Sequence, residues 1–198
     1  MEEVRDLFVR WLWLKDLFRG YFIMPRILQI AQLGHPVLQA RAEEVEGVTE
    51  PQIQSLIDDM LITVVDANGV GLAAPQVYAP VRIIVVASRP GVRYPDAPEM
   101  EPAAMINPEI LWASEEQVTG WEGCLSAPGV RAPVPRAEQV TLQYLTRNGE
   151  QNEAAFTAFL ARIIQHECDH LDGISFLERV AHPREIVMEK EFLRRTEG

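Results

Sequence analysis

The sequence has few cysteines, no surplus of basic residues and no long uncharged run. Two cysteines among 198 residues provide no disulfide framework, and this fits a reducing compartment. The 18 Lys and Arg residues against 29 Asp and Glu residues give a net charge of -11, so we expect no direct DNA binding. A transmembrane helix needs about 20 consecutive apolar residues, and the sequence contains no such stretch.

The length and composition of the chain are those of one soluble globular domain. A chain of 198 residues is long enough to bury one core and too short for two comfortable domains. Residues 1–23 stand apart, because apolar side chains recur there at helical spacing among charged ones. We expect an N-terminal amphipathic helical extension over residues 1–23, which can lie on a membrane or a partner, unless the functional chain begins at Met24.

Apolar periodicity in the remainder predicts both helices and strands. The clearest helix is expected over residues 51–67, with Pro51 in its first turn and Asn68-Gly69 at its end. Val140, Leu142 and Tyr144 alternate as in a half-buried strand, and Asn148-Gly149 favours a hairpin turn after it. Further strands are expected at residues 27–30, 81–86, 110–112 and 118–125, an irregular loop at 88–104 and a C-terminal helix at 187–193.

The pattern His-Glu-x-x-His at positions 166–170 carries the strongest chemical signal. On a helix, His166 and His170 lie one turn apart on the same face, where both imidazoles can bind one metal ion. Glu167 lies beside the first of them and can act as the general base in hydrolysis. An apolar stripe before the motif predicts a buried helix, and Gly173 after it is a natural helix stop. The stripe comprises Phe156, Phe159, Leu160, Ile163 and Ile164.

A catalytic metal site of this kind usually has three protein ligands, and the sequence leaves the third open. One known arrangement places a third histidine six residues after the second, but this chain has Phe176 there. Another takes a glutamate from a following helix, for which Glu185 or Glu189 would serve, as in a metallopeptidase. The remaining candidate is Cys124. A catalytically silent metal- or peptide-binding protein is a further alternative.

Three stretches together resemble the motifs of the peptide deformylases. They are GVGLAAPQ at positions 69–76, EGCLS at 122–126 and QHECDH at 165–170, in that order along the chain. The small residues of the first stretch indicate either a backbone that approaches something closely or a tight helix-to-strand turn. The similarity covers about residues 24–180 and leaves residues 1–23 outside. It implies an α+β fold, with antiparallel strands packed around a central metal-binding helix, and a catalytic domain over residues 24–198.

The resemblance implies a metal-dependent hydrolase that removes the formyl group from the formyl-methionyl N-termini of nascent peptides and releases formate in the cytoplasm. Cys124, His166 and His170 would hold one divalent ion, Fe(II) by family behaviour, with Zn(II), Ni(II) or Co(II) also compatible with a thiolate ligand. Glu167 would be the general base, and the Gln76 amide and Leu125 N–H would stabilise the oxyanion. The C-terminal helix could contact the ribosome transiently. Residues 183–198 balance acidic and basic side chains, so electrostatic attraction to ribosomal RNA would be weak.

Several neighbouring residues are expected to support the metal ligands or to contact the substrate. Asp169 is expected to accept a hydrogen bond from a ligand imidazole, and Glu122 with Arg136 to brace the cysteine loop. For the substrate, Val70, Gly71, Leu125 and one face of the metal-binding helix are expected to form an apolar pocket. Arg131 is expected to bind peptide backbone, and Arg162 to line the pocket with its stem while its head reaches water. Cys168 is expected to be a small core residue.

Overall fold

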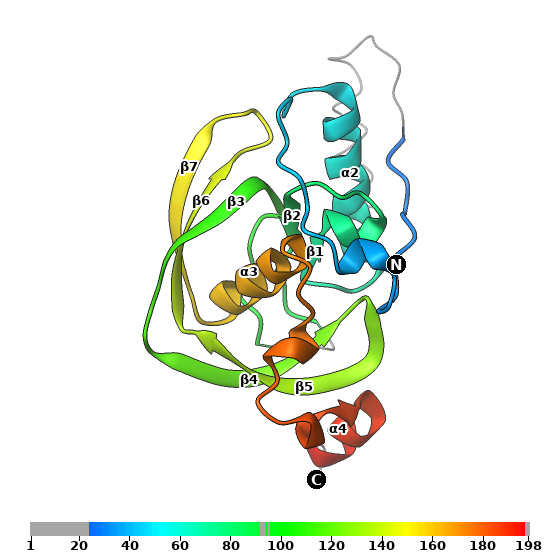
Figure 1. The fold of residues 1–198 in the computed structure, drawn as a ribbon, viewed down its shortest axis with the longest axis vertical. Helices are drawn as coiled ribbons and strands as arrows, with labels where there is room; N and C mark the ends of the chain where they lie inside the picture. Colours follow the sequence, from blue (N-terminus) through cyan, green and yellow to red (C-terminus); the bar gives the residue numbers. More distant parts are fainter. Residues whose placement is uncertain (1–23, 92–93, 95, 197–198) are drawn as a thin grey trace.

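The computed structural model describes residues 24–91, 94 and 96–196 as an α+β fold with two antiparallel sheets (Figure 1). One sheet has five strands in the order β1-β2-β3-β6-β7, and the other has three in the order β4-β5-β8. The strands are β1 Gly71–Ala73, β2 Ile83–Val86, β3 Ala103–Ala113, β4 Gln117–Cys124, β5 Ala127–Ala137, β6 Gln139–Leu145, β7 Gln151–Thr157 and β8 Val187–Met188. The helices are α2 Pro51–Asp66, α3 Ala158–Leu171 and α4 Glu189–Thr196, with one-turn helices η2 Pro36–Leu38, η3 Ala74–Val77, η4 Phe176–Arg179 and η5 Pro183–Glu185.

Strand β2 separates α2 and α3, the two longest helices of the described residues, because its side chains alternate between them. Ile84 and Val86 belong to the apolar cluster that includes α3, whereas Ile83 and Val85 belong to the cluster that includes α2. All four side chains are fully buried. Helix α3 also packs against β6 and β7, and against β5 of the other sheet. The helix that carries the histidine motif is therefore enclosed between the two sheets (Figure 1).

The sequence predicts the C-terminal end of α3, and the geometry explains it. Gly173 follows the helix with a φ of 74°, a left-handed conformation that favours glycine. A Cβ there would also lie 2.6 Å from the backbone oxygen of Gln39, so a larger residue has no room. Phe156, which we assigned to the helical stripe, lies instead in β7.

Most predicted elements are confirmed within a few residues, with two corrections. Residues 27–30 do not form a strand, and the Leu28 N–H bonds instead to a side chain of α2, Thr63 Oγ1, at 2.9 Å. The C-terminal helix begins at Glu189, and the two residues before it pair with β5 as strand β8. The predicted extension over residues 1–23 lies outside the described residues. Among the described helices, none combines the length and apolar character needed to cross a membrane.

The hairpin β4–β5 brings the cysteine motif to α3. Its register shifts between Glu122 and Cys124, so a bulge precedes the cysteine. Strand β5 tolerates Pro133 and Pro135, because β8 pairs only with its residues Val130 and Arg131. Within GVGLAAPQ, Gly69 and Val70 lie in the turn from α2 to β1, which is the helix-to-strand turn that we considered, and the other residues form β1 and most of η3.

Candidate metal centre

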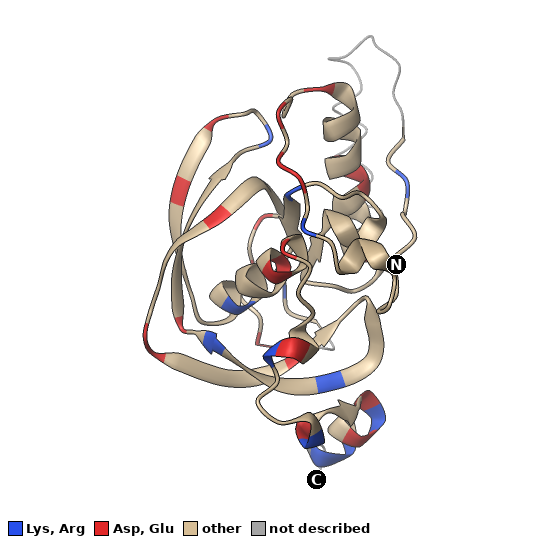
Figure 2. Ribbon diagram, viewed as in Figure 1, with Lys and Arg blue, Asp and Glu red and all other residues tan. Residues whose placement is uncertain are grey.

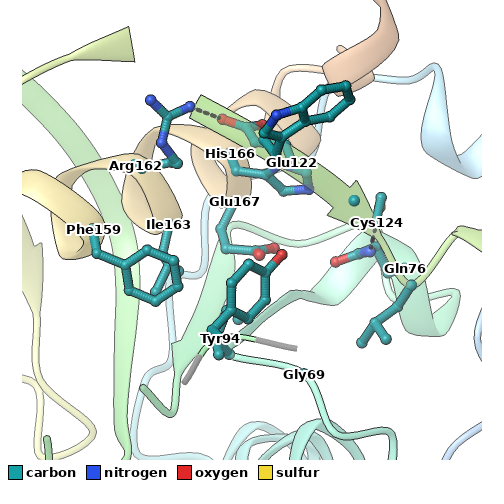
Figure 3. A pocket seen from close by; sticks show the side chains of 15 residues that line it. Gly69, Gln76, Tyr94, Glu122, Cys124, Phe159, Arg162, Ile163, His166 and Glu167 are labelled. Atoms are coloured by element: carbon teal, nitrogen blue, oxygen red, sulfur yellow. Dashed lines mark hydrogen bonds and ion pairs between the residues drawn. The ribbon is translucent and has the colours of Figure 1, made fainter. Parts of the chain in front are cut away.

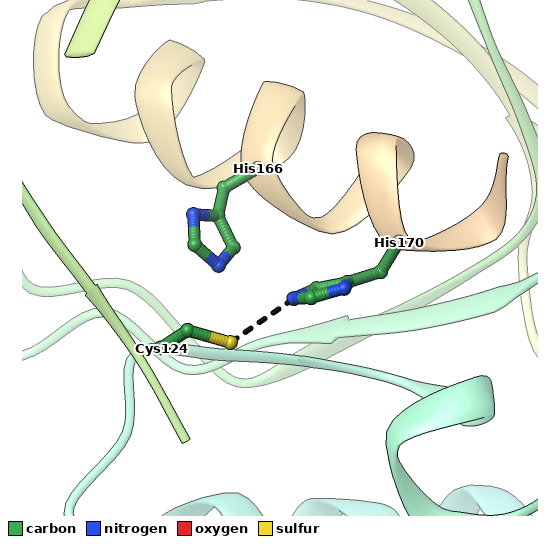
Figure 4. Close-up of side chains that lie close together, drawn as sticks. All are labelled: Cys124, His166 and His170. Atoms are coloured by element: carbon green, nitrogen blue, oxygen red, sulfur yellow. Dashed lines mark hydrogen bonds between the residues drawn. The ribbon is translucent and has the colours of Figure 1, made fainter. Parts of the chain in front are cut away.

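Cys124, at the end of β4, meets His166 and His170 of α3 (Figure 4). One potential ligand atom from each residue lies within 4.8 Å of the other two, and all three residues are buried. The Cys124 Sγ and the His170 Nε2 are 3.1 Å apart. This is the group of His, Cys, Asp or Glu side chains that the described part of the chain offers for a metal ion.

The charges at this site favour a thiolate. Burial raises the pKa of the Cys124 thiol, but the positive charge of His170 and hydrogen bonds from both histidines outweigh it and hold this pKa well below its usual range. Burial conversely lowers the pKa of His166, but hydrogen bonds to Cys124 and Glu122 raise it well above its usual range. In the metal-free centre these contacts favour a thiolate at Cys124 beside a protonated His166, and a divalent cation can take the place of the proton.

Neither glutamate proposed as an alternative third ligand belongs to this group. Glu185 is exposed in η5, and Glu189 accepts hydrogen bonds from Arg131 at 2.9 and 3.2 Å. Phe176, at the position where the other arrangement has a histidine, is buried and stacks on the His166 ring at 5.8 Å between ring centroids. Both glutamates therefore lie outside the described cluster of Cys124, His166 and His170.

Glu122 holds the outer nitrogen of His166. Its Oε2 lies 2.9 Å from His166 Nδ1, and Arg136 donates to both carboxylate oxygens at 2.9 and 3.0 Å. Burial alone would raise the pKa of Glu122, but hydrogen bonds from His166 and Arg136 lower it to about 2. The predicted Glu122–Arg136 pair is confirmed. It lies in the interior and not on the surface.

The role expected for Asp169 is filled by Glu122. Asp169 accepts from Arg136 and, at 2.7 Å, from Arg179, so it faces β5 and η4 and not the imidazoles. Its place next to His170 in the sequence points it to a different side of α3. Cys168 faces the apolar core, and burial raises the pKa of its thiol to about 12, so the core assignment is confirmed.

Glu167 and Gly71 lie in close contact. A Cβ at Gly71 would be 2.5 Å from Glu167 Oε1 and 2.8 Å from Ile163 Cγ2, so β1 approaches α3 as the small residues predicted. Glu167 is buried, and its Oε2 has no hydrogen-bond partner among the described residues. Burial raises the pKa of Glu167 to about 7.

Gln76 is held by its own loop with its amide nitrogen toward the cysteine. Its Oε1 accepts from Ala73 N at 2.8 Å, and its Nε2 donates to Cys124 Sγ at 3.4 Å and Ser126 Oγ at 3.2 Å. Leu125 follows Cys124 directly, at the start of the β4–β5 turn. Both residues border the cavity described next.

A cavity opens beside Cys124 and His166, and Glu167 also lines it (Figure 3). Its walls include the predicted Val70, Gly71, Leu125 and Arg162, and also four aromatic or apolar residues that we did not name, two of them on the helix face that we expected. Phe159 and Ile163 were detectable, since they precede His166 on the same helical face, and Trp121 adjoins the cysteine motif. Tyr94 comes from the irregular loop, where nothing in the sequence indicated it. The four additional residues are Tyr94, Trp121, Phe159 and Ile163.

Two arginines are more tightly held than we expected. The side chain of Arg162 is only 13% exposed, and its head bonds to Glu122 and to backbone oxygens of β4 and β5, so it does not reach out into water. Arg131 is buried, bonds to Glu189 and donates to the Tyr94 hydroxyl at 3.0 Å. It touches the cavity through Tyr94, and its contact with substrate stays a prediction.

Comparison with known proteins identifies the family. Residues 27–185 match the family model of polypeptide deformylase. The chain belongs to the peptide deformylase family. A relative named peptide deformylase 2 from Nostoc sp. is 51% identical over 85% of this chain and 94% of its own length. Another peptide deformylase 2, from Shewanella oneidensis, is 42% identical over 83% of this chain and 90% of its own length.

Solved peptide deformylase structures have the same fold. A class I type b peptide deformylase from Acinetobacter baumannii, crystallised with Met-Ala-Ser, aligns with a TM-score of 0.77 and 50% identity. The alignment covers 79% of this chain and all of that one. The Thermotoga maritima peptide deformylase aligns with a TM-score of 0.71 and 34% identity, over 79% of this chain and 99% of its own. The three motifs of the sequence therefore belong to one deformylase architecture.

Proposed function

We propose that Cys124, His166 and His170 bind the metal ion of this deformylase and that Glu167 is its general base. As a member of the family, the chain is a hydrolase that removes the formyl group from formyl-methionyl N-termini of nascent peptides. The observation that carries the assignment is the meeting of one buried thiol and two buried imidazoles within 4.8 Å, at a cavity that Glu167 also lines.

The three side chains fit a divalent transition-metal ion. A thiolate with two neutral imidazoles leaves one positive charge on the site, and thiolate softness favours Fe(II), Zn(II), Co(II) or Ni(II) over Mg(II). The lowered pKa of Cys124 supports the thiolate form. When bound, such an ion supplies a positive charge that polarises a carbonyl group and makes water more acidic. Fe(II) is our proposal for the native ion.

Glu167 has the position and the environment of a general base. Its carboxylate lines the cavity, and Oε2 is free to accept a proton from the attacking water. Burial holds its pKa at about 7 in the metal-free protein, which is suited to proton transfer in both directions near neutral pH. The same oxygen then gives the proton to the leaving amine, so that formate and a free N-terminus result.

Gln76 and Leu125 are proposed to stabilise the oxyanion that forms as the formyl carbon is attacked. The bond from Ala73 N to Gln76 Oε1 fixes the amide, so that Nε2 faces the site before substrate binds. Leu125 would add its backbone N–H from the residue after the cysteine. Loss of one such donor typically costs about 3 kcal/mol of barrier.

The apolar part of the cavity is proposed to take the methionine side chain of the substrate. Val70 and Gly71 would form one side, with Phe159 and Ile163 of α3 opposite them. Arg131 is proposed to act at the peptide backbone through its place beside Tyr94.

Several broader assignments belong to the same proposal. Residues 24–198 are proposed as the catalytic domain, with α3 as its metal-binding helix, and residues 1–23 as an extension that can contact a membrane. A cytoplasmic location follows from a reduced thiolate and from substrates on nascent chains. Transient ribosome contact would involve α4, whose blue and red residues are mixed along the helix in Figure 2, so electrostatic attraction to RNA would be weak.

The test is anaerobic purification followed by metal analysis and a formate-release assay on a formyl-methionyl peptide. The Glu167→Ala variant should retain its metal and lose activity by several orders of magnitude, because it lacks the unpartnered carboxylate oxygen that Glu167 presents at the cavity. Cys124→Ser should lose most of its metal. Retained metal in Cys124→Ser, or near wild-type turnover in Glu167→Ala, would overturn the assignment.

A further inference from the structure

Arg162 lies one turn before His166 on α3 and borders the cavity, yet its guanidinium is committed to the β4–β5 hairpin (Figure 3). Its Nη1 donates to Val134 O at 2.8 Å and to Gly120 O at 3.3 Å, and its Nη2 donates to Val118 O. A Cβ at Gly120 would lie 2.9 Å from Arg162 Cζ, so only glycine lets the strand approach this closely.

These bonds argue against a role for Arg162 in binding a carboxylate group of the substrate. An arginine that recognised a substrate carboxylate would need free donors directed into the cavity. The Arg162 head instead bonds to oxygens of both strands, and its side chain is only 13% exposed. What remains toward the cavity is the apolar stem.

The same guanidinium also completes the hydrogen bonding of Glu122. Arg162 Nη1 donates to Glu122 Oε1 at 2.8 Å, and Arg136 Nε donates to that oxygen at 2.9 Å. The other oxygen, Oε2, receives Arg136 Nη2 at 3.0 Å and faces His166 Nδ1 at 2.9 Å. A carboxylate has about four acceptor positions, so Glu122 is fully occupied and held in one orientation.

We propose that Arg162 is a positioning residue for the metal centre, which fixes Glu122 and through it the His166 ring. This inference rests on the proposed metal site. A Glu122 held in place accepts the Nδ1 proton of His166, so that Nε2 is left to bind metal. Without Arg162, Oε1 keeps only its bond from Arg136, so the carboxylate is held less firmly, and the His166 ring that it orients is held less firmly with it.

Arg162→Met tests this role, because methionine keeps an apolar stem of similar reach and removes the guanidinium. Arg82→Met is the matched control. Arg82 has a side chain 12% exposed and bonds to Asp172 at 2.8 Å and to backbone oxygens of Leu171 and Pro108, but it touches neither Glu122 nor His166. Zinc-loaded proteins are mixed with a chromogenic chelator to measure metal release, and cobalt-loaded proteins give the visible spectrum of the site.

We expect Arg162→Met to release zinc about 10-fold faster than the wild type, the lower end for partners that orient a ligand. The cobalt spectrum should change, Arg82→Met should match the wild type in both measurements, and Arg162→Lys should recover part of the loss. In a Glu122→Gln background, adding Arg162→Met should change the release rate by less than twofold, since the path through Glu122 is already broken.

Equal effects of Arg162→Met and Arg82→Met would overturn the proposal, because they would indicate general loosening of the fold. A full 10-fold effect in the Glu122→Gln background would overturn it as well, because Arg162 would then act by another route. Failure of the proposed function would look different. It would leave wild-type protein that binds metal without releasing formate, whatever the release rates of the variants.

Discussion

The two sheets hold α3 by different means. The five-stranded sheet contacts it with apolar side chains, among them the fully buried Ile84, Val86 and Leu142. The three-stranded sheet has only a small apolar cluster around Val134 and Phe176, and beside it lie the buried charges of Glu122, Arg131 and Arg136. One sheet therefore sets where the helix lies, and the other sets how its imidazoles are oriented.

This difference matters because apolar packing and ion pairs differ in precision. Apolar contacts are non-directional and scale with buried area, so they stabilise the helix without choosing a ring orientation. Hydrogen-bonded ion pairs are directional, and a buried pair adds little net stability once its desolvation is counted. The charged sheet is accordingly the part that the chemistry uses, and the apolar sheet is its support.

Leu142→Ala in β6 should separate the role of the apolar sheet from that of the charged sheet most clearly, because it should change stability and leave metal binding unchanged. Removing a fully buried leucine side chain should lower the free energy of unfolding by about 2–5 kcal/mol. The rate of zinc release from the folded protein should stay at the wild-type value. Urea denaturation and the chelator assay measure the two quantities. Faster zinc release in this variant would mean that packing also orients the ligands.

Gly71→Ala tests the border between the two regions, where β1 of the apolar sheet meets the proposed base. The new methyl group would lie 2.5 Å from Glu167 Oε1, so the carboxylate must move. A displacement of this size should lower kcat/KM by on the order of 100-fold, with metal content unchanged. Gly91→Ala is the control, because a Cβ at Gly91 meets nothing within 4 Å. Unchanged turnover in Gly71→Ala would show that Glu167 has a second productive position.

The difference between apolar packing and long-range ion pairs also explains which elements the sequence could predict. Helix α2, the alternating strand β6 and the histidine helix follow from apolar periodicity and turn residues, and all three are present within a few residues. Residues 27–30 have the apolar pattern of a strand, but the N–H of Leu28 bonds to Thr63 of α2, and the N–H of Arg26 just before them bonds to Asp59. Local pattern cannot reveal these partners.

At the site, spacing predicted the pair of histidines, and the resemblance supplied Cys124. The partner of His166 was missed, because Glu122 lies 44 residues away in sequence and reaches it only after β4 folds over α3. Asp169 was the nearest carboxylate in sequence, but its helical position turns it toward Arg179. Long-range ion pairs depend on where two elements cross, and that information is absent from either element alone.

The smallest expected effect is the loss, in acid, of the stability that the Glu122 carboxylate contributes in the charged sheet. The pKa of Glu122 is lowered from 4.5 to about 2, so its ionised form stabilises the folded state above pH 4.5, and this contribution is lost as pH falls toward 2. The full contribution is about 3 kcal/mol, of which about 2 kcal/mol should disappear between pH 6 and pH 3. Glu122→Gln lacks this titration, so the stability difference between wild type and variant should shrink by that amount in urea denaturation of the metal-free proteins. Glu153→Gln on the exposed face of β7 controls for the loss of one negative charge. A difference that stays constant from pH 6 to pH 3 would mean that Glu122 contributes by shape and not by charge, and the contrast between the two sheets would then lose its electrostatic half.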